Sequence, residues 1–197
     1  MPMTTNTCDS CKTKLQPHDN IMLKLEDGDQ HLCSHCYNEV MAEYLGEFDY
    51  ENIYFEPDVM TDTDGLEHTF SFSSRLIGAE QVVMEATEVK EDGLIGYAFQ
   101  IIDDTKTDPL DRYKILYEKM KRGLGIKHIQ PDDLTRYSIT DPGIVRGHIT
   151  SDLDDENDMP VVVIDGKEVS WSEFGAMVGT YMGFNFKLEL FDRSEEK

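Results

Sequence analysis

Apolar residues recur in two spacings along this chain, and each spacing predicts a different kind of element. Alternation of apolar and polar residues is typical of a strand with one buried face. It predicts an antiparallel meander of three strands, followed later by further strands. The predicted strands cover residues 69–76, 80–89, 94–102, 144–149 and 184–190.

A spacing of three and four residues predicts three helices. The first follows Cys33 and ends at Gly46. The second begins with Asp108-Pro109, an N-cap residue followed by proline at the first helical position, and ends near Leu124. The third begins at the capping box formed by Ser170 and Glu173.

Two Asp-Gly pairs predict tight hairpin turns, because both residues adopt a positive φ angle readily. Asp27-Gly28 joins two short strands over 20–26 and 30–32, and Asp165-Gly166 joins strands over 161–164 and 167–169. Strands outnumber helices and hairpins connect most of them, so an α+β fold is predicted.

The pattern also predicts how the chain divides into domains. A small metal module over 1–46 precedes an acidic linker over 47–65, which has seven acidic residues and no basic one. An antiparallel sheet domain with two helices follows over 66–192, and residues 193–197 form a charged tail.

All four cysteines of the chain fall into two CxxC pairs, Cys8 with Cys11 and Cys33 with Cys36. Two residues between cysteines let both thiolates of a tight turn face one ion, and two such turns complete a tetrahedron. The predicted ligand set is therefore Cys8, Cys11, Cys33 and Cys36, holding one Zn²⁺ per chain. Two disulfides are the alternative, and His35 is an alternative ligand within the second pair.

A knuckle, a hairpin and a second CxxC that opens a helix resemble a treble-clef zinc finger. Four thiolates leave no open position for water, so the zinc is expected to be structural rather than catalytic. A module of this size has little core of its own, which makes metal binding a source of its folding energy.

The net charge of −22, from 40 acidic and 18 basic residues, limits the partners of the chain. Such a charge opposes binding to nucleic acids and anionic membranes. The metal module carries three lysines against seven acidic residues, so it lacks the basic surface that nucleic-acid binding needs. No apolar run is long enough to predict a membrane span, and no signal peptide is apparent, so a cytoplasmic location is expected.

One stretch departs from this acidity: residues 106–127 contain seven basic and three acidic side chains. The basic residues are interpreted as a solvated helix face, or alternatively as a site for an anionic ligand. Arg146 and His148, two positions apart on one strand face, are the candidate anion-binding residues. Carboxylates at alternate positions after Ser151 mimic a calcium loop, but the glycine and closing glutamate of such a loop are missing.

The C-terminal stretch DGKEVSWSEFGAMVGTYMGFNFKLELFDRSEE is similar to the end of an uncharacterised bacterial protein family. The resemblance implies no activity and assigns no catalytic residue. We find no nucleophile elbow, dinucleotide fingerprint or phosphate-binding lysine loop in the sequence. The leading hypothesis is a non-enzymatic zinc protein that contacts a protein partner. A domain that binds a small anionic ligand, or an enzyme with a site in the second domain, is the alternative.

Overall fold

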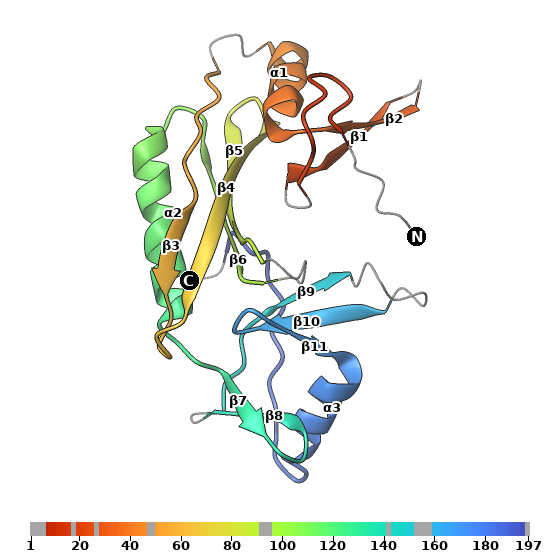
Figure 1. The fold of residues 1–197 in the computed structure, drawn as a ribbon, viewed down its shortest axis with the longest axis vertical. Coiled ribbons are helices and arrows are strands. Elements are labelled where there is room, and N and C mark those ends of the chain that lie inside the picture. Colours follow the sequence, from red (N-terminus) through yellow and green to blue (C-terminus); the bar gives the residue numbers. More distant parts are fainter. Residues whose placement is uncertain are drawn as a thin grey trace. The chain divides into compact units, whose positions relative to one another are not determined.

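The computed structural model describes residues 7–16, 19–25, 28–46, 50–90, 96–140, 143–151 and 159–195. It confirms the predicted α+β class, with three helices and antiparallel sheets in this described part (Figure 1). Two compact units divide the chain. The first contains Met1–Glu56, Phe72–Ala86 and Gln100–Leu116, and the second contains Pro57–Ser71, Thr87–Phe99 and Tyr117–Lys197.

The first unit begins with the cysteine module. Strands β1 (Ile21–Leu25) and β2 (Gly28–Leu32) form an antiparallel hairpin, and helix α1 (Ser34–Leu45) follows directly. Gly46 ends the helix with a left-handed φ of 75°, the conformation that its missing Cβ allows. The buried core of the module is small and consists of three cysteines and two leucines, namely Cys8, Leu15, Leu32, Cys33 and Cys36.

Asn38 joins helix α1 to a strand of the same unit. Its side chain is 1% exposed and makes three hydrogen bonds. The amide donates to the Asn52 side chain and to the carbonyl of Ser74, each at 2.8 Å. Its oxygen accepts from the N–H of Leu76 at 2.9 Å. A buried polar contact therefore joins the metal module to residues that come later in the first unit.

In the described part of the chain, four strands form the largest sheet, in the order β3-β4-β5-β6. The bounds of β4, β5 and β6 lie close to the predicted meander, whereas β3 falls within the predicted linker. The strands are β3 (Asp58–Thr61), β4 (Glu67–Gly78), β5 (Gln81–Glu88) and β6 (Ala98–Asp104). Within the first unit, the aromatic rings of Phe55 and Tyr113 stack at 4.7 Å, and Tyr113 also contacts Phe72 at 5.1 Å.

Helix α2 (Pro109–Leu124) has the predicted bounds, but its basic residues are not all solvated. Arg112 is 5% exposed, and its guanidinium donates to the carbonyl of Thr107 at 2.7 Å within the first unit. Lys119 is buried as well, and its ammonium donates to the carbonyl of Arg193 within the second unit. The interpretation of a solvated basic face is therefore wrong for these two residues.

The C-terminal part of the second unit has its own apolar core. Strands β7 (Ile129–Asp132) and β8 (Arg136–Ile139) pair with each other, and β9 (His148–Ser151), β10 (Pro160–Ile164) and β11 (Lys167–Ser170) form a three-stranded sheet. Helix α3 (Trp171–Gly179) starts at the predicted Ser170–Glu173 capping box. The core residues come from these elements and are Ile129, Val162, Ile164, Val169 and Met177.

Two strand predictions differ from the structure. Residues 184–190 form no strand, because no neighbouring strand pairs with them in the described part of the chain. The strand predicted over 144–149 begins later, at His148. Three predicted turns or loops fall wholly or partly outside the described residues: the first hairpin turn at Asp27, the turn at 90–93 that joins the second and third predicted strands, and the acidic loop at 152–158. Within the described part, no helix is long and apolar enough to cross a membrane.

Candidate metal centre

The first CxxC pair lies in a tight turn that precedes the hairpin. The N–H of Cys8 donates to the carbonyl of Thr13 at 2.8 Å, and the N–H of Lys12 donates to the carbonyl of Cys8 at 3.0 Å. Lys12 has a φ of 63°, a left-handed conformation that reverses the chain directly after Cys11. The turn thereby brings both side chains of the pair to one side.

The second pair lies at the start of helix α1. Cys33 is the N-cap residue in an extended conformation, and Cys36 follows in the first helical turn. The carboxylate of Asp19 accepts the N–H of Ser34 at 2.7 Å, which satisfies one of the free donors of the helix start. The remaining positive end of the helix dipole favours negatively charged thiolates.

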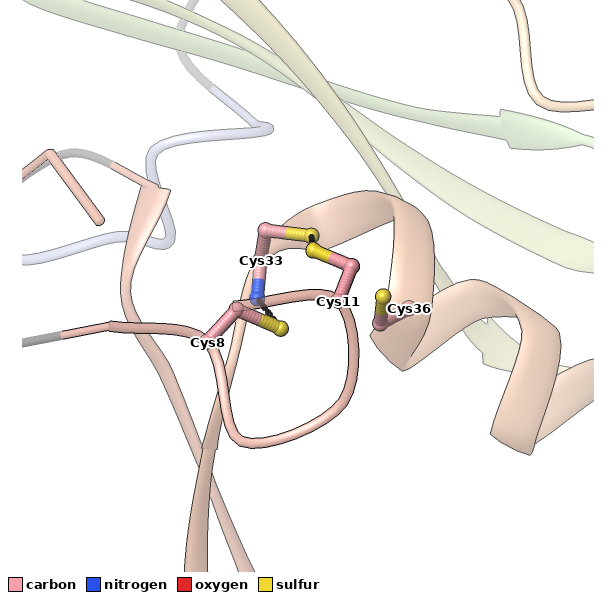
Figure 2. Close-up of side chains that lie close together, drawn as sticks. All are labelled: Cys8, Cys11, Cys33 and Cys36. Carbon is pink, nitrogen blue, oxygen red and sulfur yellow. Dashed lines mark hydrogen bonds between the residues drawn. The ribbon is translucent and has the colours of Figure 1, made fainter. Parts of the chain in front are cut away.

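The four sulfur atoms converge, as the spacing predicts (Figure 2). All four Sγ atoms lie within 4.8 Å of one another, and those of Cys11 and Cys33 are 3.8 Å apart. A tetrahedral zinc ion with Zn–S bonds of about 2.3 Å separates its sulfur ligands by about 3.8 Å. A disulfide needs a bond of about 2.05 Å, and all four cysteines are free thiols. The donor set thus fits a metal ion.

Burial and hydrogen bonding shift the pKa values of the four thiols in different directions. Burial raises the pKa of Cys33 to about 12, whereas hydrogen bonds to the side chain and backbone of Thr13 lower that of Cys11 to about 6. Burial also raises the pKa of Cys36. Four thiolates side by side therefore need a cation, because buried negative charges without one are costly.

The histidines near the two CxxC pairs contact residues other than the cysteines. His35 Nε2 lies 3.2 Å from a carboxylate oxygen of Glu39, and its ring contacts Tyr54 at 5.9 Å between centroids. His31 bonds through Nδ1 to the side chain of Asn20 at 2.9 Å. Among the described residues, the group that could hold a metal consists of the four cysteines alone.

Arg146 and His148, the predicted anion-binding residues, line one cavity of the second unit. The cavity has a volume of about 470 Å³, and Lys119 and Arg122 of helix α2 line it too. The structure therefore brings together both basic features that the sequence singled out, the strand and the helix. Sequence reasoning did not identify Asp165, which lies at the same cavity and accepts the backbone N–H groups of His128 and Ile129 at 2.7 and 2.8 Å.

A second cluster that the sequence did not reveal contains His68. Its Nδ1 lies 2.7 Å from Glu88 Oε1, and its Nε2 lies 3.3 Å from Asp62 Oδ2. The two carboxylates come from segments 20 residues after and six residues before the histidine, so only the folded chain unites them. The bond to Glu88 raises the pKa of His68 and outweighs the effect of its burial.

Comparison with known proteins gives three successive family matches, each to a domain of unknown function. Residues 7–46 match DUF7685, residues 51–125 match DUF7686 and residues 128–195 match DUF7713. No curated protein and no solved structure matches the chain. The first match contains all four cysteines, and the last covers the C-terminal stretch whose resemblance implied no activity. The comparisons therefore assign no reaction, and the function has to be argued from the sites.

Proposed function

We propose that this chain is a zinc protein in which Cys8, Cys11, Cys33 and Cys36 hold one structural Zn²⁺ in a treble-clef-like module. The convergence of the four sulfur atoms within 4.8 Å carries the proposal. A bound ion would compensate the charge of the thiolates and tie the turn at Cys8 to the start of helix α1. Four sulfur ligands complete its tetrahedron, so no position is left for a reacting water. A reducing compartment, the cytoplasm, suits these free thiols.

Metal analysis of the purified chain tests this proposal. We expect one zinc per chain for the wild type and for His35→Ala, and less than about a tenth of that for Cys33→Ser, since three thiolates bind far more weakly. The histidine variant is a control because His35 lies within the second pair but faces Glu39. Replacement of the ion by Co²⁺ should give the visible spectrum of a tetrahedral tetrathiolate site. Zinc-free protein, or two disulfides by mass spectrometry, would disprove the proposal.

We further propose that the chain makes protein contacts through residues 184–190, with a second copy of itself as the partner. The observation in favour is that Phe184, Phe186, Leu188 and Leu190 alternate with polar residues yet are between 71% and 88% exposed. Lys187 and Glu189 lie on the other face and pair at 2.5 Å. An antiparallel pairing of two copies centred on Leu188 would place Lys187 opposite Glu189 twice, so the segment is complementary to itself. From the net charge we still predict that the chain does not bind nucleic acids.

A further inference from the structure

The cavity of the second unit has the size of a small-molecule site. Its volume of about 470 Å³ falls within the range of about 300–1,000 Å³ that ligand pockets occupy. Helix α2 contributes Lys119 and Arg122, Arg146 lies just before strand β9, whose first residue His148 also lines the cavity, and the C-terminal segment contributes Arg193. Three separate parts of the unit thus direct positive charge to one cavity.

The charge of this lining is opposite in sign to that of the chain. Among the described residues, four cationic side chains line the cavity against two carboxylates, those of Asp165 and Glu189, in a chain of net charge −22. Both carboxylates already have partners. Asp165 accepts two backbone N–H groups, and Glu189 pairs with Lys187 at 2.5 Å. The cavity is therefore a local positive site within an acidic protein, and such a site concentrates small anions.

Close backbone packing fixes two of the cavity walls. A Cβ on Gly147 would lie 2.2 Å from the carbonyl oxygen of Val163, so only glycine lets the segment carrying Arg146 and His148 approach β10. A Cβ on Gly123 would lie 2.4 Å from the ring of Phe99, so this ring of β6 packs directly against the backbone of α2. The positions of the cationic side chains are thus set by tight packing rather than by loops alone.

The lining also has an apolar part and a neutral histidine. Several of the lining side chains are aromatic or aliphatic, including Tyr97, Phe99, Ile126 and Phe191. Burial, together with the positive charge of Arg193, lowers the pKa of His148 to about 4. At neutral pH this imidazole is uncharged and offers a donor or an acceptor. The cavity therefore combines positive charge, apolar surface and one neutral hydrogen-bonding group.

We propose that this cavity binds a small organic anion whose carboxylate or phosphate contacts Arg122 and Arg146 and whose apolar body lies against the aromatic lining. Guanidinium groups suit both kinds of head group, because their planar donors match two oxygens at once. The apolar body distinguishes such a ligand from an inorganic ion. The proposal is independent of the metal centre.

Titration calorimetry of the full chain with three probes tests the proposal: phenyl phosphate, inorganic phosphate and benzyl alcohol. Phenyl phosphate should bind at least about tenfold more tightly than inorganic phosphate, because burial of its ring adds more than about 1.4 kcal/mol. Benzyl alcohol has the ring without the charge and should show no binding. Benzoate in place of phenyl phosphate distinguishes a carboxylate site from a phosphate site. Equal affinity for phenyl and inorganic phosphate, or binding of benzyl alcohol alone, would overturn the proposal.

Two variants on neighbouring positions of helix α2 give a matched control. Arg122→Gln removes a lining charge and should weaken phenyl phosphate binding about tenfold or more, whereas Lys121→Gln removes the same charge outside the cavity and should leave it within about twofold. Nuclear magnetic resonance provides a second measurement on the wild type. A phosphate held beside His148 should raise the pKa of that imidazole. Equal losses for the two variants, with an unchanged His148 titration, would contradict the proposed site.

Discussion

At the scale of single residues, His68 is an example of a side chain that is held by carboxylates of this acidic chain. The imidazole lies between Glu88 and Asp62, and the ring of Tyr97 contacts it edge-on at 5.2 Å. The other oxygen of Glu88 accepts the N–H of Tyr97 at 2.8 Å. His68 and Glu88 therefore stabilise each other through a direct hydrogen bond, and Asp62 adds an ion-pair contact at 3.3 Å to the other ring nitrogen.

The pKa shifts of His68 and Glu88 predict that the contribution of this cluster to stability is greatest in mildly acidic solution. The bond to Glu88 raises the pKa of His68, so the folded chain holds that proton more tightly than the unfolded chain. Its contribution is complete below about pH 6.5, the unfolded value, and is lost as the pH rises through the folded value. The pKa of Glu88 is lowered although burial opposes this, because His68 and the Tyr97 N–H bond its carboxylate. That contribution is present above about pH 4.5 and is lost at lower pH.

Urea unfolding between pH 4 and pH 9 measures this dependence. The part of the free energy of unfolding that His68 and Glu88 contribute should be largest between roughly pH 5 and pH 6.5. His68→Gln should lower the free energy of unfolding by about 2 kcal/mol at pH 5 and by less at pH 9, because the hydrogen bond to the charged Glu88 is lost. His31→Gln, at a histidine bonded to an amide rather than to carboxylates, is the control. A loss for His68→Gln that is the same at every pH would refute the charged arrangement.

Individual residues were predictable from the sequence only where the chemistry is local. The spacing of the four cysteines alone predicts the metal ligands, because each CxxC turn is formed by neighbouring residues and does not depend on the rest of the fold. Arg146 and His148 could be paired on one strand face, but their cavity could not be foreseen. Its other walls come from helix α2 and from the C-terminal segment. His68 carried no signal at all, since its two carboxylate partners are ordinary acidic residues in a sequence full of them.

At the scale of elements, turn and cap residues carried most of the predictable structure. Asp165 and Gly166 both have a positive φ, which is why the β10–β11 hairpin could be predicted closely. The β7–β8 pair was missed because each strand has only four residues and Pro131 lies inside β7, where proline argues against a strand. Residues 184–190 show the reverse case: they alternate as a strand does, but alternation alone supplies no pairing partner.

Asn38 is the residue through which helix α1 depends on the strand that follows. Asn38→Ala would leave the N–H of the buried Leu76 and the carbonyl of the half-buried Ser74 without this partner. Each such group costs about 1–3 kcal/mol, so we expect a loss of about 3 kcal/mol in the free energy of unfolding. Glu43→Ala, on an exposed position of the same helix, should change it by less than about 0.5 kcal/mol.

Urea unfolding followed by circular dichroism gives this comparison. The same experiment bears on the predicted domain boundary at residue 46, which stays a prediction. If the metal module unfolds on its own, Asn38→Ala should create or shift a separate early transition. If helix α1 and strand β4 unfold together, the single transition should move as a whole. Equal stability of Asn38→Ala and the wild type would contradict the role assigned to its three hydrogen bonds.

At the scale of the whole molecule, the net charge of −22 and the exposed C-terminal segment act against each other. Two copies of the chain repel each other strongly at low ionic strength. The apolar face of residues 184–190 gains from burial, and this gain changes little with salt. An isolated two-stranded ribbon is only marginally stable, so repulsion of this size decides whether the contact forms. Salt should therefore promote self-association, although it weakens the binding of anions in the cavity of the second unit.

Sedimentation equilibrium tests the proposed contact between copies. Raising the salt from about 0.05 M to about 0.5 M should increase the dimer fraction, since the Debye length shrinks and the long-range repulsion is screened. Leu188→Asp places a charge at the centre of the apolar face and should abolish the dimer at both concentrations. Asn185→Asp adds the same charge on the opposite face and should retain most of it, because that side chain alternates away from the contact. A wild type that is monomeric at high salt, or equal effects of the two variants, would rule out residues 184–190 as the interface.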